Sequence, residues 1–179
     1  NPNNKSIFGL INANIFITGV SGFLGFWLIG TLIEFNKRYK LNINFQILTR
    51  RKDLFLKKYK FLLNQNIHIH EGDIRNFNKN LKECSHIIHL AAETNLIHKK
   101  TSKDVYETIT TGTKNLINIA EKSDIKNISY LSSGAVYNNI NFKKNGWKED
   151  EANFLNTHKD LYDYAHAKRK AEIILNKWF

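Results

Sequence analysis

The sequence predicts an α/β protein with a doubly wound parallel sheet and helices on both faces, a three-layer α/β/α arrangement. Two observations support this. Short apolar runs of strand length alternate with longer segments of helical periodicity, which is typical of parallel sheets with right-handed crossovers. The first apolar run also passes directly into a glycine-spaced turn and an apolar helix, over residues 14–33 (NIFITGVSGFLGFWLIGTLI). With 179 residues, we expect one domain over residues 1–179.

The glycine-spaced turn is the strongest local signal. Ile15–Ile17 reads as a strand buried on both faces, and Gly19, Gly22 and Gly25 follow it at the spacing G-x-x-G-x-x-G. The first glycine permits the tight turn, the second lets backbone N–H groups approach a pyrophosphate, and the third lets the helix pack on the sheet. The helix N-terminus then directs its partial positive charge at phosphates. The pattern predicts dinucleotide binding, against the alternative of a purely structural turn.

The apolar run that follows, Val20–Ile33, could suggest a membrane segment. It is too short to span a bilayer and contains three glycines, so a buried core helix is preferred and no membrane association is expected. The net charge of +11 could suggest a nucleic-acid partner. The lysines are scattered and no recognised nucleic-acid module appears, so we expect no nucleic-acid binding and a general attraction for anionic ligands instead.

Cysteine usage indicates the compartment. Cys84 is the only cysteine, which excludes an intramolecular disulfide and a cysteine-rich zinc site. The start of the sequence shows no basic region followed by a long apolar segment and a cleavage site. We therefore expect a cytoplasmic protein.

The remaining elements follow in alternation. His68 and His70 alternate with isoleucines, as in an edge strand, and are read as strand residues and not as metal ligands. The expected sheet has at least five strands in the order 3-2-1-4-5. Beyond the first strand and helix, strands are expected at 45–48, 67–70, 86–90 and 127–131, and helices at 53–63, 101–122 and about 159–177.

The end of the second strand lies where a dinucleotide fold meets the adenosine ribose, about 25 residues beyond Gly25. Thr49, Arg50 and Arg51 stand there in place of an acidic residue. Because guanidinium groups match a phosphate, this favours NADP over NAD; the alternative is two solvated arginines at the start of a loop. Further along, Asp73 is expected to meet the adenine amino group.

Two more positions lie at carboxyl ends of strands, where open α/β sheets place their ligands. Ala91 and Ala92 are small residues where the backbone must pass close to a cofactor, and Ser132–Tyr137 follows the last expected strand. On the final helix, Tyr164 and Lys168 are four residues apart and share one face. Taken alone, such a pair is usually a surface pair.

Together these pieces resemble the extended short-chain dehydrogenase/reductase family, the nucleotide-sugar epimerases, dehydratases and reductases with a Rossmann fold. The resemblance covers nearly the whole chain. It is carried by the motifs Thr18–Gly25 (TGVSGFLG), Gly72–Ile74 (GDI), His89–Ala92 (HLAA), Gly112–Leu116 (GTKNL), Ser132–Tyr137 (SSGAVY) and Tyr164–Lys168 (YAHAK) with Ala171 and Glu172.

This resemblance implies a hydride-transfer site in which Ser133 steadies the substrate oxygen, Tyr164 exchanges its proton, and Lys168 stabilises the phenolate. It implies a nucleotide-sugar substrate and a nicotinamide cofactor. We also expect a homodimer. The residues expected to bind the cofactor are Gly19, Ser21, Gly22, Phe23, Leu24, Gly25, Thr49, Arg50, Asp73, Ile74, Leu90, Ala91, Ala92, Tyr164 and Lys168, and no metal is expected.

The sequence departs from the family pattern in three respects. Many members carry an asparagine where Ile109 stands, and the dehydratases have an acidic pair where Gly134 and Ala135 stand. The second departure favours epimerase or reductase over dehydratase. Family members also usually continue well past the Tyr–Lys helix, so we expect this chain to be the cofactor-binding part of a longer protein, without the substrate domain and inactive alone.

Other functions stay open. The motifs Gly22–Gly25 and His89–Ala92 are also similar to the acyl-thioester reductases of the same family. A non-catalytic dinucleotide-binding subunit is a third possibility, against which the joint presence of Ser133, Tyr164 and Lys168 speaks.

Overall fold

A computed structural model describes residues 9–63, 65–81, 83–92, 101–125, 127–137, 146, 148–149 and 164–178. The chain divides into two compact units. Unit 1 comprises residues 1–91 and 118–131, and unit 2 comprises residues 92–117 and 132–179.

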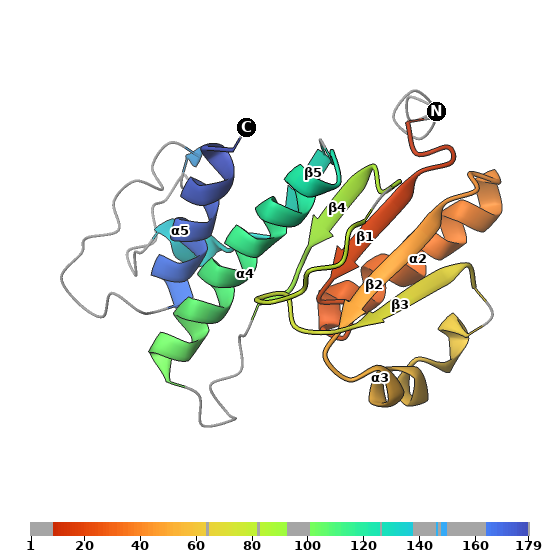
Figure 1. Ribbon diagram of the computed structural model, residues 1–179, viewed down its shortest axis with the longest axis horizontal. Coiled ribbons are helices and arrows are strands. Elements are labelled where there is room, and N and C mark those ends of the chain that lie inside the picture. The colour runs from red at the N-terminus through yellow and green to blue at the C-terminus, as the bar shows by residue number, and fades with distance from the viewer. Residues whose placement is uncertain are drawn as a thin grey trace. The chain divides into compact units, whose positions relative to one another are not determined.

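Unit 1 contains a five-stranded parallel sheet (Figure 1). The strands are β1 (Asn14–Thr18), β2 (Asn44–Thr49), β3 (Ile67–Glu71), β4 (His86–His89) and β5 (Asn127–Tyr130). Their spatial order is β3-β2-β1-β4-β5. The predicted parallel sheet and its strand order are therefore confirmed.

The central strand β1 explains this order. Ile15, Phe16 and Ile17 are all fully buried, so the strand has no face that could be left in water. Ile17 pairs with Ile47 of β2 on one side and with Ile88 of β4 on the other. Pairing on both sides with helices over the sheet is the arrangement that such a strand requires.

Strand β3 lies at one edge of the sheet, as the alternation of His68 and His70 with isoleucines predicted. His68 is exposed, whereas His70 is buried, with its Nε2 2.8 Å from Gln46 Oε1. Burial and then the nearby His68 lower the pKa of His70 to about 4, so its ring is neutral at physiological pH. Among the described residues no group of three or more His, Cys, Asp or Glu side chains is placed to hold a metal.

The helices of unit 1 are α2 (Phe23–Tyr39) and α3 (Lys52–Lys58). One helix was expected over 53–63, and this is wrong: α3 ends at Lys58, and a 3-10 helix, η1 (Lys60–Leu62), follows. At the break, Tyr59 leaves the helical conformation with φ −115° and ψ 55°. The centroids of the Tyr59 and Phe55 rings are 4.8 Å apart, and the Tyr59 hydroxyl donates a hydrogen bond to the carbonyl of Ser21. Tertiary packing therefore overrides the local helical periodicity at Tyr59.

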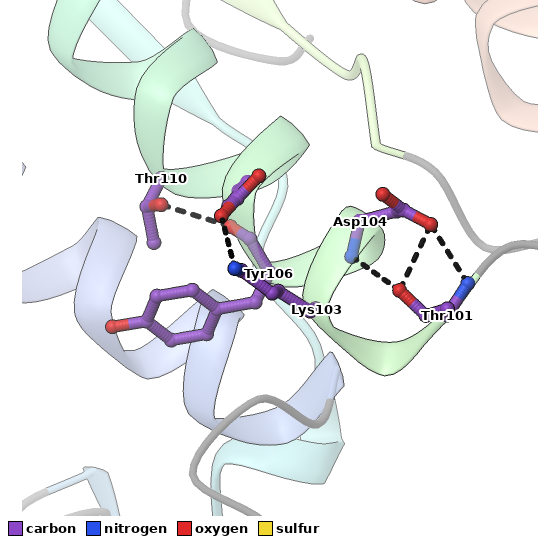
Figure 2. Close-up of polar contacts among 6 residues, drawn as sticks. Thr101, Lys103, Asp104, Tyr106 and Thr110 are labelled. Carbon is purple, nitrogen blue, oxygen red and sulfur yellow. Dashed lines mark hydrogen bonds and ion pairs between the residues drawn. The ribbon is translucent and has the colours of Figure 1, made fainter.

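Unit 2 contains most of α4 (Ser102–Lys122), the 3-10 helix η3 (Gly134–Tyr137) and α5 (Tyr164–Asn176). A capping pair starts α4 (Figure 2): the Asp104 N–H donates to Thr101 Oγ1 at 3.2 Å, and the Thr101 N–H donates to Asp104 Oδ2 at 2.9 Å. The expected helix at 101–122 is confirmed. The final helix is confirmed from residue 164, residues 159–163 lie outside the described part, and η3 was not expected.

Because most of α4 belongs to unit 2, the presence of helices on both faces stays a prediction. No helix in the described ranges is both long and apolar enough to cross a bilayer.

Candidate functional site

The turn between β1 and α2 depends on two glycines for its shape. Gly19 has φ +78°, in the left-handed region, and a Cβ there would lie 2.5 Å from the Ala91 backbone nitrogen. A Cβ on Gly25 would collide with the carbonyl oxygen of Gly19 and the backbone of Val20. The chain therefore passes so closely over itself that side chains at these two positions are excluded.

Gly22 is different. Among the described residues, a Cβ there would meet only the Gly19 carbonyl oxygen, at 3.4 Å, which is an acceptable contact. The residue is exposed and its φ of −79° suits any amino acid. Within the part of the chain that the structure describes, packing does not require glycine at this position.

The start of α2 offers donors for an anion. The Gly22 N–H is used inside the turn, donating to the Gly19 carbonyl at 3.1 Å, and the first helical bond runs from the Phe26 N–H to the Gly22 carbonyl at 2.9 Å. The amides of Phe23, Leu24 and Gly25 therefore precede the helical hydrogen-bond ladder and have no carbonyl within it. No acidic side chain occupies this first turn. Phe23 is 78% exposed and Leu24 is 55% exposed, whereas Gly25 is buried, so the accessible surface lies around the first two of these residues.

The end of β4 forms the wall of this turn. Thr18 Oγ1 lies 2.6 Å from Nδ1 of the buried His89 and accepts a hydrogen bond from the Ala91 N–H at 3.2 Å. The His89 ring also stacks on Tyr130 of β5, with centroids 5.7 Å apart. These contacts hold Leu90 and Ala91 against Gly19. The sequence motifs contained Thr18 and His89, but their structural role was missed because it depends on the side-by-side pairing of β1 and β4.

The carboxyl ends of β2 and β3 bring together opposite charges. The Gly72 N–H donates to the Thr49 carbonyl at 2.9 Å, which joins the two strand ends. The Asp73 carboxylate is held by the guanidinium of Arg75, through Nε at 3.0 Å and Nη2 at 2.8 Å. The hydrogen bonds from Arg75 lower the pKa of Asp73, and the charge of Arg50 adds a smaller effect. Arg75 was not singled out in the sequence, and it supplies a second guanidinium at this edge.

In unit 2, α5 carries the tyrosine and lysine expected to react. Tyr164 and Lys168 lie one turn apart, with the Lys168 Nζ 5.8 Å from the centroid of the Tyr164 ring. Lys168 is only 1% exposed. Burial lowers the pKa of Lys168 to about 8, an effect that the carboxylate of Glu172 partly opposes. The pair is therefore partly desolvated and unlike an ordinary surface pair.

Glu172 joins this helix to the segment that carries Ser133. Ser132 Oγ donates to Glu172 Oε1 at 2.5 Å, and Arg169 Nη1 donates to Glu172 Oε2 at 2.8 Å. Next to Ser132, the Ser133 hydroxyl accepts the Ala135 N–H at 3.2 Å at the start of η3, which packs on α5. Unit 2 therefore holds Ser133, Tyr164 and Lys168 in one connected arrangement, and Glu172 is a member that the sequence placed only in a motif.

Comparison with known proteins shows the family of the chain. Residues 16–177 match the 3-beta hydroxysteroid dehydrogenase/isomerase family. The chain belongs to this family. Its matches among curated and solved proteins include sugar 4-epimerases and a dTDP-glucose 4,6-dehydratase, which are classes that the sequence motifs indicated.

Two curated relatives are 4-epimerases by name. The N-acetyl-alpha-D-glucosaminyl-diphospho-ditrans,octacis-undecaprenol 4-epimerase of Escherichia coli O157:H7 is 26% identical over 172 residues, covering 94% of this chain and 44% of that protein. The putative UDP-glucose 4-epimerase of Methanocaldococcus jannaschii is 32% identical over 131 residues, covering 72% of this chain and 41% of that protein. The chain thus spans about half or less of the length of these relatives.

Solved structures show the same fold. The UDP-N-acetylglucosamine 4-epimerase of Methanobrevibacter ruminantium M1 has a TM-score of 0.73 at 23% identity and covers 93% of this chain and 50% of that chain. The dTDP-glucose 4,6-dehydratase DesIV of Streptomyces venezuelae, solved with NAD, has a TM-score of 0.72 at 19% identity and covers 92% of this chain and 51% of that chain. The Rossmann-like α/β fold is therefore confirmed.

One family position is apolar in this member. Ile109, where many members have asparagine, is buried in α4, and its carbonyl accepts a hydrogen bond from the Thr113 hydroxyl at 2.8 Å. The neighbouring Thr108 hydroxyl is buried without a hydrogen-bond partner among the described residues. The amide side chain of the family pattern has therefore no equivalent at residue 109.

Alanine substitutions at Gly19 and Gly22 should differ in their effect on the free energy of unfolding. We expect Gly19→Ala to lower the free energy of unfolding by about 2–4 kcal/mol, because it forces a positive φ on alanine and a clash with Ala91. Gly22→Ala is expected to change it by less than about 1 kcal/mol, because its Cβ meets only an ordinary contact. Urea denaturation of both variants measures this, and equal losses would contradict the assignment.

The buried ammonium of Lys168 predicts a pH-dependent stability. The pKa falls from 10.5 in the unfolded chain to about 8 in the folded one, so between these values the unfolded state binds the extra proton. The contribution of Lys168 to stability is therefore unfavourable below pH 8 and improves as the pH rises towards 10.5. We expect Lys168→Met to be more stable than the parent at pH 7, with the difference shrinking by pH 10. Denaturant titrations at both pH values would show a constant difference if the ammonium is not desolvated.

Proposed function

We propose that unit 1 binds a nicotinamide dinucleotide at the turn between β1 and α2. The amides of Phe23 and Leu24, two exposed residues at the start of α2, suit a pyrophosphate, and the space beside Gly22 would admit it without a change in the described chain. Among similar structures, DesIV and the UDP-glucuronic acid 4-epimerase of Bacillus cereus were both solved with NAD. Gly19, Ser21, Gly22, Phe23, Leu24 and Gly25 would surround the phosphates, Leu90, Ala91 and Ala92 would form the wall, and Thr49, Arg50, Asp73 and Ile74 would meet the adenosine.

We further propose that unit 2 supplies the proton-transfer groups for an alcohol–ketone interconversion. The observation that carries this proposal is the buried Lys168 beside the Tyr164 ring. Keeping an ammonium out of water costs stability, and such groups are concentrated at functional sites. A tyrosine titrates near pH 10 when unperturbed, so it needs a nearby cation to act as a base at neutral pH.

The roles of the residues follow from their chemistry. Tyr164 would take the proton of the substrate hydroxyl, Lys168 would stabilise the phenolate, and Ser133 would donate a hydrogen bond to the same substrate oxygen. The nicotinamide, when bound, would supply hydride transfer at the carbon bearing that oxygen. If the hydride returns to the opposite face of the resulting ketone, the product is the epimer.

The substrate class we propose is a sugar diphosphate, and the reaction is 4-epimerisation. Both curated relatives with an assigned activity are named as 4-epimerases of glucosyl or N-acetylglucosaminyl diphosphates. After Ser133, the chain has Gly134 and Ala135, which carry no acid that could eliminate water. These residues favour an epimerase over a 4,6-dehydratase.

The test of this function uses the protein as its gene encodes it, with UDP-glucose and UDP-N-acetylglucosamine. We expect inversion at C4 of the sugar. The anomeric and H4 signals in proton NMR would monitor this inversion. Tyr164→Phe should lower turnover by a factor of about 100 or more while dinucleotide affinity stays nearly constant, because the phenol acts in the transition state. Turnover close to that of the parent in Tyr164→Phe would refute the mechanism. Release of a 4-keto-6-deoxy sugar would refute the preference for an epimerase.

A preference for NADP over NAD is a separate proposal. Arg50 and Arg51 directly follow the last residue of β2, where a dinucleotide fold meets the adenosine ribose, and guanidinium groups match a 2′-phosphate. We expect the Kd for NADP to be below that for NAD, and Arg50→Ala to remove most of the difference. Arg38→Ala, an exposed arginine near the end of α2, is the control. Calorimetric titration with both dinucleotides decides this, and an NAD affinity equal to or tighter than that for NADP would overturn it.

We also propose that the protein acts as a homodimer in the cytoplasm. Strand β5 is an outer strand of the described sheet, which leaves an edge for pairing with a second copy of the chain. Cys84 is a buried free thiol, which suits a reducing compartment such as the cytoplasm. Burial raises the pKa of Cys84 to about 11, so this thiol is a poor nucleophile. Sedimentation velocity over a range of concentrations would test the dimer, and a single monomer boundary throughout would exclude it.

A further inference from the structure

Tyr59 makes a hydrogen bond that crosses from α3 to the glycine turn. Its hydroxyl donates to the carbonyl of Ser21 at 2.9 Å. Tyr59 is only 5% exposed, whereas Ser21 lies on the exposed tip of the turn. A buried aromatic side chain of unit 1 is therefore attached directly to the segment that would face the phosphates.

We propose that Tyr59 is a positioning residue for dinucleotide binding, acting through the peptide group between Ser21 and Gly22. This inference rests on the proposed function, because it assumes that the turn binds the pyrophosphate. It adds to that function a residue outside the turn, at the junction between α3 and η1.

The geometry of one peptide group explains the effect. In a planar trans peptide, the carbonyl of Ser21 and the N–H of Gly22 point in opposite directions. The carbonyl accepts the Tyr59 hydroxyl at 2.9 Å, and the N–H donates to the Gly19 carbonyl at 3.1 Å. This peptide group is therefore held at both ends, and any rotation would break two hydrogen bonds.

The glycines make such a restraint necessary. Gly22 has no Cβ, so the backbone on this side of the peptide could adopt many conformations at little cost. Gly22 also precedes the first residue of α2, and its carbonyl accepts the first helical hydrogen bond, from the Phe26 N–H at 2.9 Å. Rotation of the Ser21–Gly22 peptide would therefore displace the amides of Phe23 and Leu24, which are the donors proposed for the phosphates.

The ring of Tyr59 is itself fixed. It packs against Phe55 of α3, with centroids 4.8 Å apart, and against Phe26 of α2, with centroids 5.5 Å apart. Phe26 lies in the first turn of α2. The Tyr59 ring therefore contacts the start of α2, and its hydroxyl contacts the glycine turn that precedes this helix. The end of α3 at Lys58 sets the backbone of Tyr59 for this position, since the chain leaves the α-helical conformation there.

The experiment uses Tyr59→Phe, which keeps the ring and removes only the hydroxyl. A typical hydrogen bond contributes about 1 kcal/mol, which corresponds to about a fivefold change in affinity. We expect the Kd of this chain for ADP, which carries the diphosphate, to rise about fivefold. The Kd for adenosine, which lacks phosphates, should stay within about twofold. Calorimetry or ligand-detected NMR measures both, and Tyr39→Phe, at an exposed tyrosine of α2, is the matched control that should change neither Kd.

A second measurement does not depend on ligand affinity. Amide hydrogen exchange of residues 19–25 should be faster in Tyr59→Phe than in the parent and in Tyr39→Phe, while exchange in β1 and β2 stays constant. Unchanged ADP affinity together with unchanged exchange in the turn would overturn the inference. Equal weakening of ADP and adenosine would also overturn it, because it would indicate a general loss of structure. If the parent chain binds no ADP, NAD or NADP at all, the proposed dinucleotide site itself is refuted.

Discussion

The close approach of two backbones at Gly19 and Ala91 is the constraint on which unit 1 depends. The turn after β1 runs so near the end of β4 that a single Cβ would not fit between them. Thr18 and His89 hold these two strand ends together through their side chains, and β4 pairs with β1 in register beside them. As a result, the start of α2 is fixed at the carboxyl edge of the sheet, where its exposed amides can face an anion.

The turn is supported from its other side by aromatic packing. Phe26, Phe55 and Tyr59 form a cluster that joins α2 to the end of α3, and the Tyr59 hydroxyl extends this support to the turn itself. The glycines give the turn the freedom it needs to take up its shape. The wall of β4 and the aromatic cluster then remove that freedom again, which is the condition for binding a ligand without reorganisation.

Unit 2 buries a charged side chain, whereas the aromatic cluster of unit 1 buries apolar rings. Its α5 keeps a lysine almost completely out of water, against the preference of an ammonium for solvent, with Glu172 as the opposing charge one turn away. The same Glu172 carboxylate accepts a hydrogen bond from Ser132, the residue before Ser133. Glu172 therefore interacts both with Lys168 and with the segment that carries Ser133. A lysine whose pKa lies near neutrality can serve as a cation or respond to a neighbouring phenol, which is what the proposed proton transfer needs.

The sequence by itself determined the parallel sheet, its strand order and the glycine turn. These features depend on local patterns: fully apolar strands such as Ile15–Ile17, and glycines at a spacing that only a few backbone shapes allow. Tertiary structure alone decided the break of α3 at Tyr59, the pairing of Asp73 with Arg75, and the contacts of Thr18 and Glu172. Each of these features depends on how the chain packs and on its backbone geometry, and not on local periodicity. No propensity or motif spacing specifies such a contact before the chain has packed.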